Sequence, residues 1–180
     1  VSHVIPGSAS APDFPCLFLT YYANAYFGVA QCCQIDALRS VIELVKNKCA
    51  ENVLLTVLMS VMSAAASTTT HFAQFLKVKS QSTCDNLLSK RKINIIEECK
   101  ALLKEYRNSG LCSKQECAEY DCYNLDFSEC LNSIALNSST LVYADPPYFK
   151  EHYSRYYHVL NTLCLYDYPA MALNPQTHEL

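Results

Sequence analysis

A four-residue string near the end of the chain has the residue types for chemistry on a planar amine. It is Asp145-Pro146-Pro147-Tyr148, which joins an acid, two rigid residues and an aromatic ring. The Asp145 carboxylate and the Pro146 carbonyl are acceptors for amine hydrogens, and proline fixes φ so that the carbonyl stays aimed. Tyr148 offers a face for stacking a base extruded from a duplex. Acceptors at both hydrogens favour the pyramidal amine that attacks a methyl group, so the string predicts a clamp for an exocyclic amine.

The elements that must position this string are predicted from periodicity. Residues 141–144 are apolar and predict a strand that ends at Asp145. Residues 121–124 predict an earlier strand, and residues 127–136 predict a helix between the two. This order is typical of a parallel α/β sheet, whose ligands gather at the carboxyl ends of the strands. A tyrosine-rich helix over 151–165 is expected to follow the string.

The middle of the chain is predicted to be helical. Apolar residues recur at helical spacing over 34–49 and again over 93–106. Residues 53–66 are almost continuously apolar and predict a buried helix, but they fall short of the ~20 residues needed to cross a bilayer. Residues 1–15 lack the basic start and apolar centre of a secretory signal. We therefore expect no membrane span and a cytoplasmic protein.

The charge of the chain is unevenly distributed. The net charge of −3 by itself argues against a nucleic-acid partner, because phosphate binding depends on cationic patches. Between residues 71 and 114, however, nine basic residues stand against four acidic ones, so this stretch carries +5 and the rest carries −8. Such a stretch is either a phosphate-facing surface or the solvated face of a helix.

The eleven cysteines are expected to be free thiols. An odd number cannot all pair within the chain, and the absence of a secretory signal favours a reducing compartment. The run Cys112, Cys117, Cys122 and Cys130 contains no pair with the two-residue spacing that lets neighbouring thiolates share one zinc ion. We expect no metal site.

Several segments resemble adenine-specific DNA methyltransferases of the restriction-modification and orphan type. The resemblance is closest around the Asp-Pro-Pro-Tyr string and spans most of residues 21–169. It is carried by residues 141–148, 153–158 and 166–169 in the last third, and by residues 24–28, 35–39 and 70–74 upstream.

The resemblance implies a fold and a division of the chain. The fold would be α/β, a partial Rossmann-like methyltransferase fold with a largely helical insert. Residues 1–20 would be an irregular N-terminal segment. Residues 21–120 would be mostly helical and include the insert that reads target DNA, in agreement with the +5 stretch. Residues 121–180 would form part of the catalytic core.

The resemblance also implies a reaction, in which a methyl group passes from S-adenosylmethionine to the N6 amine of adenine in double-stranded DNA. Asp145, Pro146, Pro147 and Tyr148 would be the catalytic tetrapeptide. Residues 124–126 are similar to the motif whose acid contacts the cofactor's adenine ring, so Asp126, with Asp145, would bind the cofactor.

The residues expected to contact DNA are Ser154 and Arg155 after the tetrapeptide and Lys77, Lys79 and Arg91 in the basic stretch. Arginine, lysine and serine commonly contact phosphate. The family also implies a possible partner, a restriction endonuclease that cleaves the same DNA when it is unmethylated.

One departure from the family leaves alternatives open. The glycine-rich cofactor loop is absent, since the only glycines are Gly7, Gly28 and Gly110. This departure predicts a chain truncated at its N-terminus and puts catalysis by the chain alone in doubt. An alternative is an inactive DNA-binding remnant of such an enzyme. A protein glutamine methyltransferase is a further alternative, but Asp145 and the long helical insert favour DNA.

Overall fold

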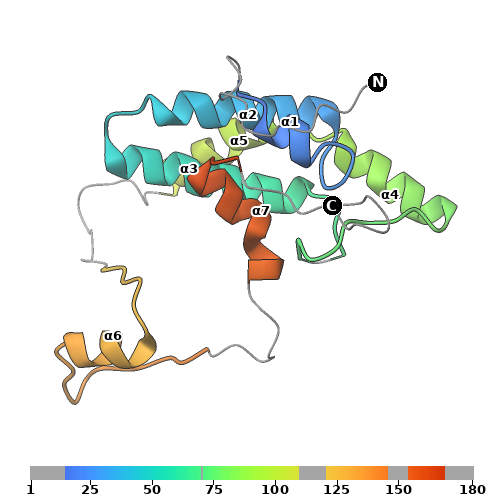
Figure 1. The fold of residues 1–180 in the computed structure, drawn as a ribbon. Coiled ribbons are helices and arrows are strands. Elements are labelled where there is room, and N and C mark those ends of the chain that lie inside the picture. The colour runs from blue at the N-terminus through green and yellow to red at the C-terminus, as the bar shows by residue number, and fades with distance from the viewer. Residues whose placement is uncertain (1–14, 70, 110–120, 146–153, 169–180) are drawn as a thin grey trace.

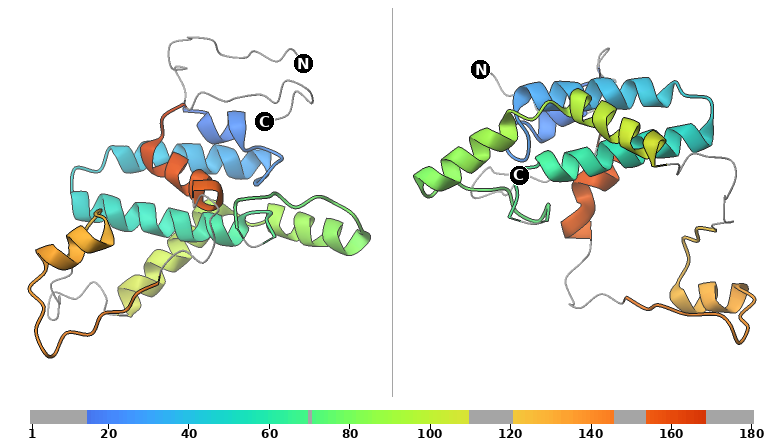
Figure 2. Two further views of the ribbon diagram at one scale, coloured as in Figure 1. Left: turned by 60° about the horizontal axis from the view of Figure 1, so that its bottom comes forward. Right: turned by 180° about the vertical axis from the view of Figure 1, so that it is seen from behind.

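The computed structural model describes residues 15–69, 71–109, 121–145 and 154–168, and these residues form seven helices (Figure 1). The helices are α1 (Leu17–Tyr21), α2 (Val29–Glu43), α3 (Lys48–Ala65), α4 (Gln81–Arg91), α5 (Ile95–Asn108), α6 (Phe127–Ser133) and α7 (Ser154–Leu165). Helices α2, α3 and α5 pack on one another, α1 packs on α2, and α7 packs on α3 (Figures 1 and 2).

The expectation of an α/β, Rossmann-like fold is wrong for the described residues. They contain no strand, and their only β-type pairings are two isolated bridges, Ala23 with Phe27 and Thr68 with Phe75. The strands predicted over 121–124 and 141–144 are irregular and exposed. The physical reason is that two short strands around one helix cannot bury both faces of a sheet, so pairing them gains too little to offset the loss of chain entropy.

The helices predicted for the middle of the chain are confirmed with shifted bounds, because local caps decide where they begin. Asn47 accepts a hydrogen bond from the Ala50 amide (3.0 Å) and starts α3 five residues before the apolar run. Asn94 accepts from the amides of Ile96 and Glu97 and starts α5. The helix predicted over 127–136 is the shorter α6, and the helix predicted over 151–165 is described from Ser154 onward as α7.

The core joins α1, α2, α3, α5 and α7 through side chains without solvent exposure. The largest of them are Phe18, Phe27, Ile35, Leu58, Ile95 and Leu163. Helix α4 contributes no buried residue, and neither does α6, which lies apart from the other helices in Figure 1 and in the right-hand view of Figure 2. The core therefore positions α7, the helix that follows the Asp-Pro-Pro-Tyr string.

Among the described residues, α3 is the one helix long and apolar enough to cross a membrane by length and composition. One face of it is buried in the core through Val57, Leu58 and Met62. On the exposed face, the hydroxyls of Ser60 and Ser63 donate to carbonyls one turn earlier, at 2.9 and 2.8 Å. Helix α3 is therefore two-sided, with one apolar face in the core and hydroxyl side chains on the exposed face.

A buried carboxylate on α2 holds α1 in place. Asp36 is 1 % exposed and accepts hydrogen bonds from the amides of Phe18 (2.9 Å) and Leu19 (3.0 Å), which lie in the first turn of α1. It also accepts from the hydroxyl of Tyr166 (2.7 Å). Burial raises the pKa of Asp36, and the hydrogen bonds from Tyr166, Phe18 and Leu19 offset part of that rise. Asp36 acts as an N-cap supplied by a neighbouring helix.

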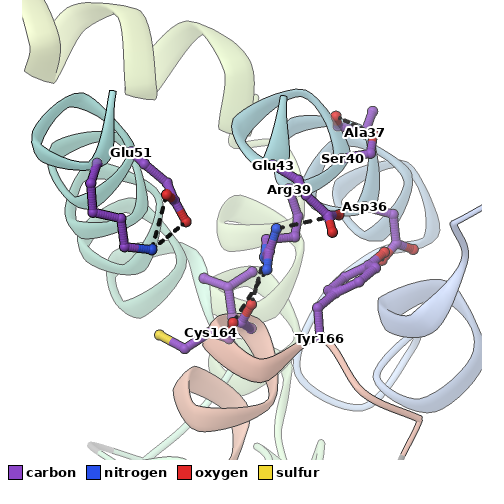
Figure 3. A network of polar contacts seen from close by, with 10 residues as sticks. Asp36, Ala37, Arg39, Ser40, Glu43, Glu51, Cys164 and Tyr166 are labelled. Atoms are coloured by element: carbon purple, nitrogen blue, oxygen red, sulfur yellow. Dashed lines mark hydrogen bonds and ion pairs between the residues drawn. The ribbon is translucent and has the colours of Figure 1, made fainter. Parts of the chain in front are cut away.

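One turn further along α2, Arg39 donates hydrogen bonds to the carbonyls at the C-terminal end of α7 (Figure 3). Its Nε donates to the Leu163 carbonyl (2.9 Å) and its Nη2 to the Cys164 carbonyl (3.2 Å), both in the last turn of α7. Its guanidinium lies 5.3 Å from the ring centroid of Tyr166. A cation at the C-terminal carbonyls of a helix also complements the helix dipole.

Tyr166 ends α7 in the left-handed region, with φ 48°. This conformation favours glycine and costs a residue with a side chain about 1 kcal/mol. Tyrosine is held there because Asp36 accepts its hydroxyl and Arg39 covers its ring. The two α2 residues thus fix the direction in which the chain leaves α7.

We expect the Asp36→Ala variant to lose ~3 kcal/mol of unfolding free energy, because two buried amides and one hydroxyl lose their acceptor together. Urea unfolding followed by circular dichroism measures the loss. The matched control is Asp85→Ala, which removes an exposed carboxylate on α4 that accepts a hydrogen bond from the Gln81 side chain and should cost no more than about 0.5 kcal/mol. Equal losses in the two variants would contradict this role of Asp36.

Tyr166 also predicts how stability depends on alkaline pH. Burial and the hydrogen bond to Asp36 raise the pKa of Tyr166 above the ordinary value of 10.0. The unfolded chain therefore releases a proton above pH 10 that the folded chain retains, so stability is intact below pH 10 and falls as the pH rises beyond it. In Tyr166→Phe this fall should be less steep by about 1.4 kcal/mol per pH unit. Urea unfolding between pH 9 and about 11 tests this, and an unchanged slope would refute it. Tyr143→Phe, at a side chain 84 % exposed, is the control.

Candidate nucleic-acid interface

The structure describes the first residue of the Asp-Pro-Pro-Tyr string and the helix that follows the string. Asp145 is described and exposed, whereas Pro146, Pro147 and Tyr148 lie outside the described residues. The description resumes at Ser154, the first residue of α7. What the structure gives for the string is therefore the exposed carboxylate that begins it and the helix that follows it.

Helix α7 docks through aromatic contacts that start near its first turn. The His158 ring packs against the rings of Tyr22 (6.1 Å between centroids) and Tyr26 (5.8 Å). One turn later, the Tyr22 hydroxyl and the Thr162 Oγ1 are 3.1 Å apart. Burial raises the pKa of Tyr22 and Tyr26, so both hydroxyls remain protonated donors. Helix α7 is thus fixed against residues 22–26.

Tyr26 also lines a cleft of about 670 Å³. Its wall is the loop that follows α3, together with Thr83 from the first turn of α4. The Phe75 ring meets the Tyr26 ring edge-on at a centroid distance of 6.1 Å. Tyr26 contacts both His158 and Phe75, and the His71 ring of the same loop contacts the Tyr156 ring of α7 at a centroid distance of 5.4 Å, so the loop and α7 are neighbours.

Backbone pairing determines the shape of the loop. The Ser67 amide donates to the Tyr26 carbonyl (2.8 Å), and the Leu76 amide donates to the Ser67 carbonyl (2.8 Å). The Tyr26 hydroxyl donates to the Phe72 carbonyl. These bonds turn the loop back onto residues 22–27 and leave the Phe75 side chain 42 % exposed in the cleft.

The cleft is cationic and contains an aromatic side chain. Lys77 and Lys79 line it, and none of the described residues that line it is acidic. Neither lysine forms a salt bridge within the described ranges. The Lys77 Nζ lies 5.7 Å from the ring centroid of Phe75. Because Lys79 immediately precedes Ser80, the N-cap of α4, the positive end of that helix dipole lies at the same wall.

Arg91, the third cation predicted to contact DNA, is engaged within the protein. Its guanidinium donates to the Ser67 Oγ, the Asn24 Oδ1 and the Ala25 carbonyl, each at 3.3 Å. Burial lowers the pKa of Arg91. A Cβ at Gly28 would meet the Arg91 Cδ at 3.2 Å, so a larger residue there would require the Arg91 side chain to shift by a few tenths of an ångström. A phosphate contact by Arg91 would compete with three protein contacts.

Ser154 and Arg155, the other predicted DNA contacts, lie in the first turn of α7 and are exposed. The Arg155 carbonyl lies 3.2 Å from the His158 Nδ1. His158 in turn contacts Tyr26, which lines the cleft that contains the two lysines.

Asp126, the predicted cofactor contact, has a structural role in the described fold. It is the N-cap of α6, and its Oδ1 accepts a hydrogen bond from the Ser128 amide at 2.9 Å. Every residue from 121 to 145 is exposed except the half-buried Cys130. A site for a ligand as large as S-adenosylmethionine is concave and encloses most of its surface. The described residues around Asp126 do not fit that cofactor. Within the described part of the chain, no group of three or more His, Cys, Asp or Glu residues is placed to hold a metal ion.

The sequence did not identify the two aromatic residues of the site. Tyr26 and Phe75 lie in or beside segments 24–28 and 70–74, which resemble the methyltransferase family, but the resemblance gave them no role. An aromatic residue in a loop has no periodicity that distinguishes a ligand contact from a core residue. The charge asymmetry did point to Lys77 and Lys79.

Comparison of the chain with protein-family models, with curated proteins and with solved structures found no match. The functional assignment therefore rests on the residues and their geometry.

The Arg91 contacts lead to a stability prediction. We expect Arg91→Ala to lower the free energy of unfolding by about 1–2 kcal/mol, because three acceptors on two segments lose their shared donor. The control is Arg107→Ala, at an exposed position in the last turn of α5, which should change it by no more than about 0.5 kcal/mol. Thermal or urea unfolding gives both values. A loss of DNA affinity in Arg91→Ala without a loss of stability would show instead that Arg91 contacts DNA.

Proposed function

We propose that this chain is part of an adenine-specific DNA methyltransferase of the Asp-Pro-Pro-Tyr type, acting on the N6 amine of adenine in double-stranded DNA. The observation that supports the proposal is that the helix after the string lies close to a cationic cleft. Helix α7, which follows the Asp-Pro-Pro-Tyr string, contacts Tyr26 through His158, and Tyr26 also lines the cleft that contains Lys77 and Lys79. A base-clamping string and a phosphate-binding surface must lie close together if both are to act on one strand.

The tetrapeptide has the groups that the reaction needs from the protein. The exocyclic amine of adenine is a weak nucleophile because its lone pair is delocalised into the ring. The Asp145 carboxylate and the Pro146 carbonyl accept its two hydrogens and so favour the pyramidal form, whose lone pair is available for attack. Tyr148 stacks on the adenine once it has left the duplex, and this contact offsets part of the cost of unstacking.

In this proposal the helical cluster positions α7, the helix that follows the string, relative to DNA. Arg39 and Asp36 fix the end of α7, and Tyr22 and Tyr26 fix its beginning. Lys77 and Lys79 bind phosphates without reading sequence. Positioning of this kind is a large part of catalysis, because a reacting group displaced by 1 Å can lose about 100-fold in rate.

The methyl donor in the proposed reaction is S-adenosylmethionine. The described residues do not form its site, so no step through the donor is derived from them. The proposal places the protein in the cytoplasm, where its DNA is accessible, and a restriction endonuclease that cleaves the same unmethylated sequence is its possible partner.

A second candidate function is that of an inactive DNA-binding remnant. Two observations favour it: the lack of a glycine-rich loop and the engagement of Asp126 in capping α6. Such a remnant would bind DNA without binding S-adenosylmethionine. A glutamine methyltransferase is less well supported, because Asp145 and the cationic cleft both favour a nucleic-acid substrate.

Transfer of radiolabelled methyl from S-adenosylmethionine to unmethylated genomic DNA tests the proposal. We expect label in N6-methyladenine with the full chain and a loss of ~100-fold or more in Asp145→Ala, because one of the two acceptors for the amine is removed. The control Asp121→Ala removes an exposed carboxylate before α6 and should keep full activity.

Other outcomes of this experiment would contradict the proposal. Label in another base, or label that Asp145→Ala does not reduce, would overturn the proposal. DNA binding without any methyl transfer and without binding of S-adenosylmethionine by calorimetry would establish the remnant instead.

A further inference from the structure

We propose that the cleft between the loop after α3 and the start of α4 holds one nucleotide of a DNA strand, with the base against Phe75 and the phosphate between Lys77 and Lys79. The inference rests on the proposed function for its choice of DNA. It extends that function by assigning a nucleotide subsite separate from the Asp-Pro-Pro-Tyr string. Its test measures binding and does not require methyl transfer.

The size and walls of the cleft suit a nucleotide within a polymer. At about 670 Å³ it falls within the range of small-molecule sites in proteins, roughly 300–1,000 Å³. It is open to solvent, so a strand can enter and leave it. Its lining includes the aromatic side chain of Phe75 and the cations Lys77 and Lys79, which matches a ligand with a flat ring and a charged backbone.

The base would contact Phe75. An edge-on contact with Tyr26 holds this ring in place, and the side chain is 42 % exposed. The Lys77 Nζ lies over this ring at 5.7 Å from its centroid, so a base that stacks on the same face takes the place of the ammonium group. The Gln74 amide lies in the same wall and can both donate to and accept from a base edge. Stacking on an aromatic ring tolerates every base.

The phosphate would lie between the two lysines. Lys77 and Lys79 have no acidic neighbour among the residues lining the cleft, so a phosphate would not compete with a protein carboxylate. The hydroxyls of Thr69 and Thr83 are further donors in the wall. The positive end of the α4 dipole adds to the same field, and Thr83 lies in the first turn of that helix. Lysine binds phosphate as a point charge, so this subsite should not select a sequence.

Fluorescence anisotropy of a labelled single-stranded thymidine 12-mer, titrated with the full chain at several salt concentrations, tests the subsite. We expect Lys77→Gln/Lys79→Gln to bind about tenfold more weakly and to lower the slope of log affinity against log salt by about 1.4, since each cation on a single strand contributes ~0.7. Phe75→Leu should weaken binding by about fivefold or more at an unchanged salt slope, because it removes stacking and no charge.

The control is Lys46→Gln/Lys104→Gln, which removes the same charge from exposed positions outside the cleft and should keep its affinity within about twofold. Circular dichroism confirms that each variant is folded, and the lysine variants alter only side chains that form no salt bridge in the described ranges. Equal losses in the cleft pair and the control pair, or wild-type affinity in Phe75→Leu, would overturn the inference.

The two proposals fail separately. Methyl transfer to adenine with no effect of the cleft variants on strand binding would remove the subsite and leave the enzyme assignment. Binding that depends on the cleft, without methyl transfer, would keep the subsite and remove the enzyme assignment. A uridine 12-mer serves to distinguish RNA from DNA. If it binds through the cleft more than about tenfold more tightly than the thymidine 12-mer, the occupant is RNA and the inference as stated is overturned.

Discussion

The buried carboxylate of Asp36 is the constraint on which the rest of the structure depends. Helix α1 has five residues, too few to be stable by its own hydrogen bonds, and two of its first amides donate to Asp36. The same carboxylate accepts from Tyr166, which is 130 residues away in the sequence. Arg39, one turn along α2, completes the last turn of α7. Two polar residues on one helix thereby join the beginning of the fold to the helix that follows the Asp-Pro-Pro-Tyr string.

The sequence predicted those helices that bury a regular apolar stripe, and it failed where tertiary contacts or missing partners decide the outcome. Helices α2, α3 and α5 were predicted, although their caps moved the bounds. Helix α1 was missed because its stability comes from Asp36 on another helix, and α4 because it buries no side chain. The strands predicted over 121–124 and 141–144 were wrong, because a strand requires a hydrogen-bonding partner that a local pattern cannot supply.

The sequence predicted the charged residues of the candidate site but not how they are arranged in space. Uneven charge indicated Lys77 and Lys79, which share one wall of the cleft. The same criterion also selected Arg91, whose guanidinium instead joins α4 to the turn before α2. Charge alone cannot distinguish a cation that binds a ligand from one that binds the protein. Tyr26 connects the cleft to α7 through ring contacts between residues far apart in the sequence, and no sequence period reports such contacts.

Photocross-linking followed by mass spectrometry tests most directly whether the cleft and the Asp-Pro-Pro-Tyr string bind the same DNA. A duplex with 5-iododeoxyuridine at scattered thymine positions would be irradiated with the full chain, and the modified peptides sequenced. We predict cross-links in the peptide that carries Phe75 and in the peptide that carries residues 145–158. Cross-links confined to other surfaces, such as the exposed face of α5, would contradict a shared DNA site.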